Sequence, residues 1–114
     1  MKLRLILIEK RKIEEEIRQL CKEVYVEAKR LLQIAKTVQD RVFYLKMIAD
    51  AFRYLAQLER GKALLKLIDE TRNRYERATG EAESLEDTNP IKLALILNFS
   101  VFEYEIAQNF EAAI

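Results

Sequence analysis

The chain has 114 residues, of which 50% are hydrophobic and 34% are charged, and it contains only two Gly and one Pro. This composition predicts a single all-α domain over residues 1–114, because strands and turns would require more Gly and Pro. A net charge of +1 argues against binding to nucleic acid or to an anionic membrane surface.

The absence of His and the presence of one Cys, Cys21, exclude further classes. Without His there is no Ser-His or Cys-His mechanism and no common metal ligand, so we expect no enzyme, no metal and no cofactor. A lone Cys cannot form an internal disulfide and fits the reducing cytoplasm. No apolar run approaches the roughly 20 residues of a membrane-spanning helix, so we expect no membrane partner.

The first helix is predicted over residues 1–35. Apolar residues recur in steps of three and four, which is typical of a helix packed along one side. Cys21 lies on a neighbouring apolar face with residues 25, 28 and 32, and we expect it to be a buried small hydrophobe. The predicted core stripe comprises Ile13, Ile17, Leu20, Val24, Ala28, Leu31 and Ala35.

The start of this helix has apolar residues on all sides. Such a segment needs a cover, and we expect a homo-oligomer that forms through it; an aggregation-prone terminus is the alternative. The apolar residues are Leu3, Leu5, Ile6, Leu7 and Ile8.

The second helix is predicted over residues 39–60, with Thr37 or Gln39 as its cap and Gly61 as a left-handed end. Most of its residues are apolar, so we expect it to be buried except along one line exposed to water. That line is either an ion-paired structural stripe or an anion site. Its residues are Lys46, Asp50, Arg53, Gln57 and Arg60.

The third helix is predicted over residues 62–86, with Gly80 inside it. Its core stripe comprises Leu64, Ile68, Thr71, Tyr75, Ala78, Ala82 and Leu85.

The fourth helix is predicted over residues 90–107, with Asn89 as its cap and Pro90 at its first position. Gln108 and Asn109 interrupt the apolar pattern, so residues 109–114 are predicted to start a further, truncated helix. Short connections favour an antiparallel stack of about four helices, one long and three shorter.

Three segments resemble the 14-3-3 family. The fifth helix of that family is similar to FYLKM at residues 43–47, followed by Asp50 and by RYLA at residues 53–56. Its seventh helix is similar to NPIKL at residues 89–93, LNFSVF at 97–102 and YEI at 104–106, and its fourth to KIE at 12–14 with Glu16 and LC at 20–21. The resemblance covers the chain from Lys12 onward and implies the central part of a 14-3-3 protomer.

The resemblance implies an adaptor that binds phosphoserine or phosphothreonine in extended segments of partner proteins, and not an enzyme. A guanidinium and a phenol are suitable donors to phosphate, and an amide suits an extended backbone. The implied contacts are Arg53 and Tyr54 to phosphate, Lys46 in the groove, Asp50 as an orienting carboxylate, Asn98 to the peptide backbone, Leu97 and Val101 as apolar groove residues, and Glu105 as a polar groove contact.

Other parts of that family have no counterpart here. Its third helix supplies a lysine and an arginine of the phosphate pocket, its first two helices form the dimer, and its last two close the groove. The resemblance therefore implies at most half a groove, in a fragment, a divergent relative or an engineered miniature.

Structural roles are the alternatives for these residues. Asp50 and Arg53 can form an intrahelical pair, and Asn98 can be a satisfied interior amide. Two functions stay open: a phosphopeptide-binding module with an incomplete groove, and a self-associating helical scaffold without phosphopeptide binding.

Overall fold

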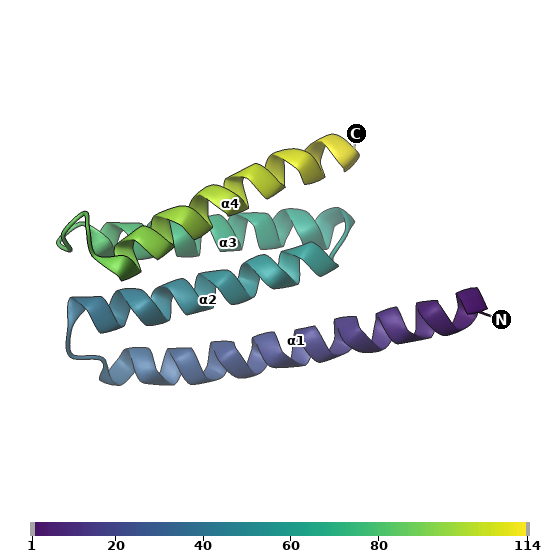
Figure 1. Ribbon diagram of the computed structural model, residues 1–114, viewed down its shortest axis with the longest axis horizontal. Helices are drawn as coiled ribbons and strands as arrows, with labels where there is room; N and C mark the ends of the chain where they lie inside the picture. Colours follow the sequence, from purple (N-terminus) through teal and green to yellow (C-terminus); the bar gives the residue numbers. More distant parts are fainter. Residues whose placement is uncertain (1, 114) are drawn as a thin grey trace.

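A computed structural model describes the backbone of residues 2–113 and the side chains of residues 2–106. Within the described residues there are four helices and no strand, which confirms the predicted all-α class. Successive helices run antiparallel, α1 packs on α2, and α2 packs on α3 and α4 (Figure 1). The helices are α1 (Lys2–Ile34), α2 (Val38–Leu58), α3 (Gly61–Ala82) and α4 (Pro90–Ala113).

Local chemistry accounts for the helix starts. Thr37 precedes α2, and its hydroxyl accepts a hydrogen bond from the backbone N–H of Asp40 at 3.1 Å. Asn89 precedes α4, and its Oδ1 accepts from the N–H groups of Ile91 and Lys92 at 2.9 and 3.3 Å. Both side chains satisfy N–H groups that a helix start leaves unpaired. Gly61, the first residue of α3, has φ +62°, a left-handed conformation that other residues rarely adopt.

Two predicted helix ends are wrong. Helix α3 includes Gly80 but ends at Ala82 rather than at residue 86. The N–H of Glu83 bonds to the carbonyl of Gly80, a tightening that is common where a helix ends. The break expected at residues 108–109 is absent, because α4 continues to Ala113. Gln and Asn cost a helix only tenths of a kcal/mol relative to Ala, roughly, so two amides are a weak stop signal. The last residue of the truncated helix expected at 109–114 lies outside the described residues.

The core lies between α2, α3 and α4. The predicted stripe of α3 faces it, and Tyr75 at its centre is completely buried. The Tyr75 ring stacks on Phe99 with a centroid separation of 5.2 Å and lies 5.6 Å from Phe102. The buried cluster comprises Val42, Leu45, Ala49, Ile68, Tyr75, Ala78, Ala82, Leu95 and Phe102.

Helix α1 packs on α2 through a face that shares Ala28 with the predicted stripe but also includes Cys21 beside it. Cys21 and Ala28 are its buried residues, whereas Ile13 and Leu20 are 53% and 58% exposed. Ile17, Val24 and Leu31 of the predicted stripe are half-buried, so the prediction is wrong only at the exposed Ile13 and Leu20. Cys21 is the buried small hydrophobe that the sequence predicts, and burial raises the pKa of its thiol.

An aromatic cluster joins α1 to the rest of the core. Tyr25 of α1 meets Phe52 of α2 edge to face at 5.5 Å. The guanidinium of Arg74 on α3 lies 5.5 Å from the Tyr25 ring and 4.5 Å from the Phe52 ring. Arg74 thus holds three helices together by cation–π contacts.

Candidate functional site

The polar residues of α2 lie under α3 and α4 rather than along a water-exposed line. The side chains of Lys46, Asp50 and Arg53 are only 18%, 15% and 10% exposed. The apolar side is more open than predicted, since Phe43 and Tyr54 are 43% and 46% exposed. The prediction of one wet polar stripe is therefore wrong at its centre, because the packing of α3 and α4 decides which face of α2 is covered.

The carboxylate of Asp50 is the acceptor that this cluster shares. It accepts from Lys46 Nζ at 2.7 Å and from the Asn98 amide at 3.1 and 3.2 Å. The Tyr75 hydroxyl donates to the same carboxylate, and Arg53 Nη2 lies 3.9 Å from it. A half-buried carboxylate is stabilised by this number of donors. Asp50 thus fixes side chains from three helices at one point.

Arg53 extends the cluster toward Tyr54. Its Nη2 donates to the Tyr54 hydroxyl at 3.4 Å, and the guanidinium lies 5.0 Å from the centre of the Tyr54 ring. With Lys46, Arg53 places two positive charges beside one carboxylate. The local charge is positive, and both cations are held by neighbours, which favours an anionic ligand.

Tyr75 belongs to this network although the sequence predicts it only as a core residue. Burial, followed by the hydrogen bond to Asp50, raises the pKa of its hydroxyl, so the group stays protonated and remains a donor. A buried tyrosine hydroxyl usually needs a hydrogen-bond partner, so the residue type itself indicated that Tyr75 could join a polar network. Its partner is on another helix and could not be identified from sequence spacing.

The remaining predicted residues lie along α4. Asn98 reaches Asp50, whereas Leu97 beside it is 63% exposed. Val101 is half-buried and follows Leu97 on the same face. Glu105 is one turn further along and accepts from Gln57 Nε2 of α2 at 3.1 Å. The structure therefore brings Lys46, Asp50, Arg53, Tyr54 and Asn98 together, and it places Glu105 against Gln57.

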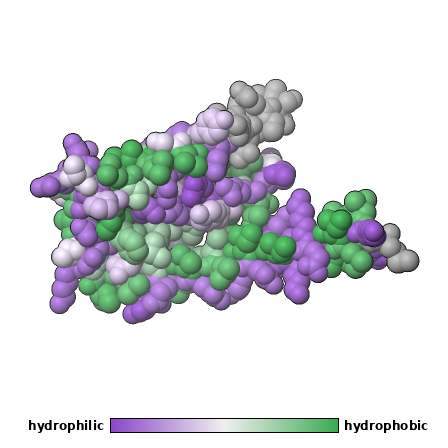
Figure 2. Space-filling view, in the orientation of Figure 1, coloured by the Kyte–Doolittle hydropathy of each residue, from purple (hydrophilic) through white to green (hydrophobic). Residues whose placement is uncertain are grey.

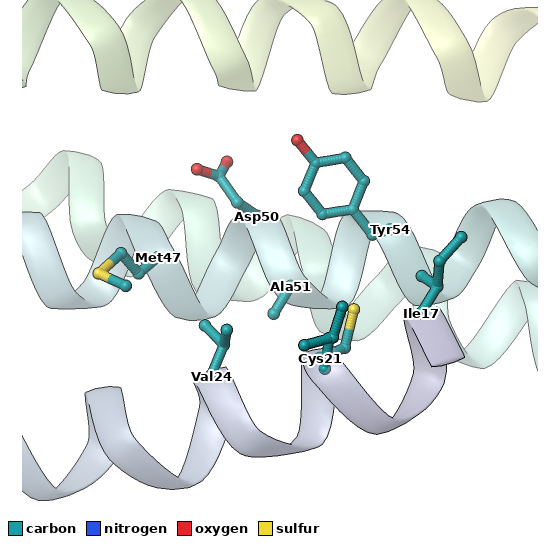
Figure 3. A pocket seen from close by; sticks show the side chains of 8 residues that line it. Ile17, Cys21, Val24, Met47, Asp50, Ala51 and Tyr54 are labelled. Atoms are coloured by element: carbon teal, nitrogen blue, oxygen red, sulfur yellow. The ribbon is translucent and has the colours of Figure 1, made fainter. Parts of the chain in front are cut away.

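An apolar pocket of about 320 Å³ lies next to the cluster, between α1 and α2. Asp50 and Tyr54 direct their polar ends toward α4, whereas Val24 and Cys21 project from α1 toward α2 (Figure 3). A polar cluster beside an apolar hollow is typical of a binding surface. The lining residues are Ile17, Leu20, Cys21, Val24, Met47, Asp50, Ala51 and Tyr54.

Two further findings concern the described part of the chain. Its His, Cys, Asp and Glu side chains form no group of three that could hold a metal ion. In the same part of the chain, no helix combines the length and the hydrophobicity that a membrane span requires.

The fold and the cluster together define an all-α protein with a cation pair ordered by a half-buried carboxylate. The family model described as 14-3-3 protein matches residues 1–114, and the chain belongs to the 14-3-3 family. The match begins at residue 1, so it extends the resemblance over the segment before Lys12.

Relatives from three organisms have similar sequences. The chain is 44% identical to 14-3-3 protein homolog 2 of Schistosoma mansoni over 97 residues, covering 83% of the chain and 45% of that protein. It is 41% identical to human 14-3-3 protein theta over 114 residues, covering 98% of the chain and 46% of that protein. It is 42% identical to 14-3-3-like protein GF14 omicron of Arabidopsis thaliana over 104 residues, covering 90% of the chain and 41% of that protein. The chain thus spans about half the length of the curated relatives it matches.

Proposed function

We propose that this chain is a non-enzymatic adaptor module that binds phosphoserine or phosphothreonine peptides in an incomplete groove. The observation that carries the proposal is the arrangement of Lys46 and Arg53 around Asp50, with the Tyr54 hydroxyl beside Arg53. A phosphorylated residue carries a charge of about −1.5 to −2 and three acceptor oxygens. The cluster offers the complementary positive charge and donors.

Arg53 and Tyr54 are the proposed phosphate contacts, with Lys46 as a point charge nearby. A guanidinium presents two parallel N–H groups to a phosphate, and a phenol adds a neutral donor. Asp50 cancels one of the two positive charges in the cluster. We therefore expect affinity weaker than a site with uncompensated cations would give.

On α4, Asn98 is the proposed contact to the peptide backbone. Its amide nitrogen donates hydrogen bonds to the Asp50 carboxylate, so the amide oxygen is available to accept a hydrogen bond from a peptide N–H. Leu97 and Val101 are the proposed apolar contacts, and Leu97 is exposed as such a role requires. Glu105 is the proposed polar contact at the end of this surface.

Fluorescence anisotropy with a labelled phosphoserine peptide tests the proposal, with the same peptide carrying serine as the control. We expect the phosphopeptide to bind at least about tenfold more tightly, since charge-assisted hydrogen bonds contribute roughly 1.5–3 kcal/mol. The preference should diminish as salt rises, because the contact is electrostatic. Equal binding of the two peptides would exclude a phosphate site.

Self-association through the start of α1 is a second proposed function. α1 has 33 residues and α2 has 21, and the N-terminal end of α1 extends past the other helices (Figure 1). Apolar side chains gather at that end (Figure 2). Burial of such exposed side chains against a second copy would be favourable. The residues are Leu3, Leu5, Ile6, Leu7 and Ile8, which are 49% to 73% exposed.

Sedimentation velocity of the double variant Leu3→Ser/Ile6→Ser tests this second function. We expect the unaltered chain to sediment as a dimer or larger species. The dissociation constant of this oligomer should be at least about tenfold higher for the variant. Leu65→Ser, at an exposed apolar position of α3, is the matched control and should behave as the unaltered chain. A monomer at all concentrations, or an equal effect of Leu65→Ser, would contradict self-association through this end.

A further inference from the structure

The Nε–H group of Arg53 is buried and has no hydrogen-bond partner among the described residues. Arg53 as a whole is only 8% exposed, and the contacts to Asp50 and Tyr54 both involve Nη2. A buried N–H without a partner loses its hydration without compensation, so such groups are usually bonded to protein or to an ordered water. We therefore expect the Nε–H of Arg53 to donate to an acceptor that is not part of the described protein.

A small cavity lies at this position between α2, α3 and α4. Its volume is about 10 Å³, which is close to the least that holds one water molecule. Arg53, Gln57 and Glu105 supply its polar lining, and side chains such as Ile68 and Phe102 supply apolar lining. The cavity is too small for any ligand larger than water.

Gln57 and Glu105 provide the acceptors that a water in this cavity needs. Gln57 Nε2 donates to Glu105 Oε2 at 3.1 Å, which links α2 to α4. The amide oxygen of Gln57 and the second carboxylate oxygen of Glu105 are then available as acceptors. A water that accepts from Arg53 Nε and donates to these two oxygens makes three hydrogen bonds, the usual number for a buried water.

We propose that Gln57 and Glu105 hold a single water against Arg53 Nε and thereby fix the plane of its guanidinium. Glu105 is then a positioning residue on the protein side of the site, together with Gln57. The consequence for ligand binding rests on the proposed phosphopeptide function, whereas the water itself does not.

The test uses the side-chain ¹H–¹⁵N signal of Arg53 Nε in the free 114-residue chain. We expect a resolved signal that exchanges slowly and shows a cross-peak to bound water. Gln57→Leu and Glu105→Leu should each make exchange about tenfold faster, as expected when a hydrogen-bonded partner is lost. Glu105→Gln keeps an acceptor oxygen and should restore slow exchange. Gln33→Leu, at an exposed position of α1, is the matched control and should leave the signal unchanged.

Fast exchange in the unaltered chain, or an unchanged signal in both leucine variants, would overturn the proposal. Phosphopeptide titrations of the same variants separate it from the proposed function. If no peptide binds while the water cross-peak is present, the proposed function fails and the water site stands. If the peptide binds and both leucine variants leave the Arg53 signal unchanged, the water site fails and the proposed function stands.

Discussion

Replacing Arg53 with alanine is expected to weaken phosphopeptide binding by about 10- to 100-fold. The substitution removes the charged donors proposed to contact the phosphate, and such hydrogen bonds contribute roughly 1.5–3 kcal/mol. Asp50 keeps Lys46, Tyr75 and Asn98 as donors, so no carboxylate is left without partners. Anisotropy titration with the labelled phosphoserine peptide measures the change.

Two further variants show whether charge or geometry is responsible. Arg60→Ala removes an exposed arginine in the connection just before α3, seven residues after Arg53, and should leave the dissociation constant unchanged. Arg53→Lys keeps the charge but loses the planar pair of donors, so an intermediate affinity is expected. Equal binding by Arg53→Ala and the unaltered chain would remove Arg53 from the site.

Replacing Tyr75 with alanine is expected to lower the free energy of unfolding by about 3–5 kcal/mol, as removal of a large core aromatic does. The ring is completely buried, stacks on Phe99, and its hydroxyl donates to Asp50. A domain of this size has about 5–15 kcal/mol in total, so the loss removes much of its stability. Urea denaturation followed by circular dichroism measures the effect.

Tyr75→Phe separates packing from hydrogen bonding at the same position. It keeps the ring and removes the hydroxyl, so a loss of about 1–2 kcal/mol is expected. Leu65→Ala, at an exposed position on the same helix, is the control and should change stability by less than about 1 kcal/mol. Equal losses for Tyr75→Phe and Tyr75→Ala would mean that the ring packing contributes little.

Local sequence chemistry was sufficient to predict much of the fold. Four helices, the caps at Thr37 and Asn89 and the buried stripe around Tyr75 follow from short-range patterns. Each of these features depends on residues close together in the sequence, so it can be predicted without knowing how the helices pack. The continuation of α4 through residues 108–109 was missed, because two amides carry only a weak preference against a helix.

The orientation of the helices could not be predicted in the same way. Two apolar faces of α1 meet at Ala28, and contact with α2 decides that Cys21 rather than Leu20 is buried. The polar residues of α2 share one face by periodicity, but their burial depends on α3 and α4. Patterns along one helix identify its faces; the neighbouring helices decide which face is covered.

The candidate site likewise combines residues that one helix groups with residues that only helix packing brings together. Lys46, Asp50 and Arg53 belong to one stripe of α2, so the sequence already groups them. Tyr75 joins through its contact with Asp50, 25 positions away, and Gln57 of the same stripe contacts Glu105, 48 positions away. Such partners arise only when the helices pack.

Chemical-shift mapping with the phosphoserine peptide tests the central claim most directly, since it reports which side chains the ligand reaches. The proposed site predicts that the side-chain signals of Arg53, Lys46 and Asn98 move most, and that these changes disappear in Arg53→Ala. Shifts confined to the start of α1, or shifts that persist unchanged in Arg53→Ala, would contradict it.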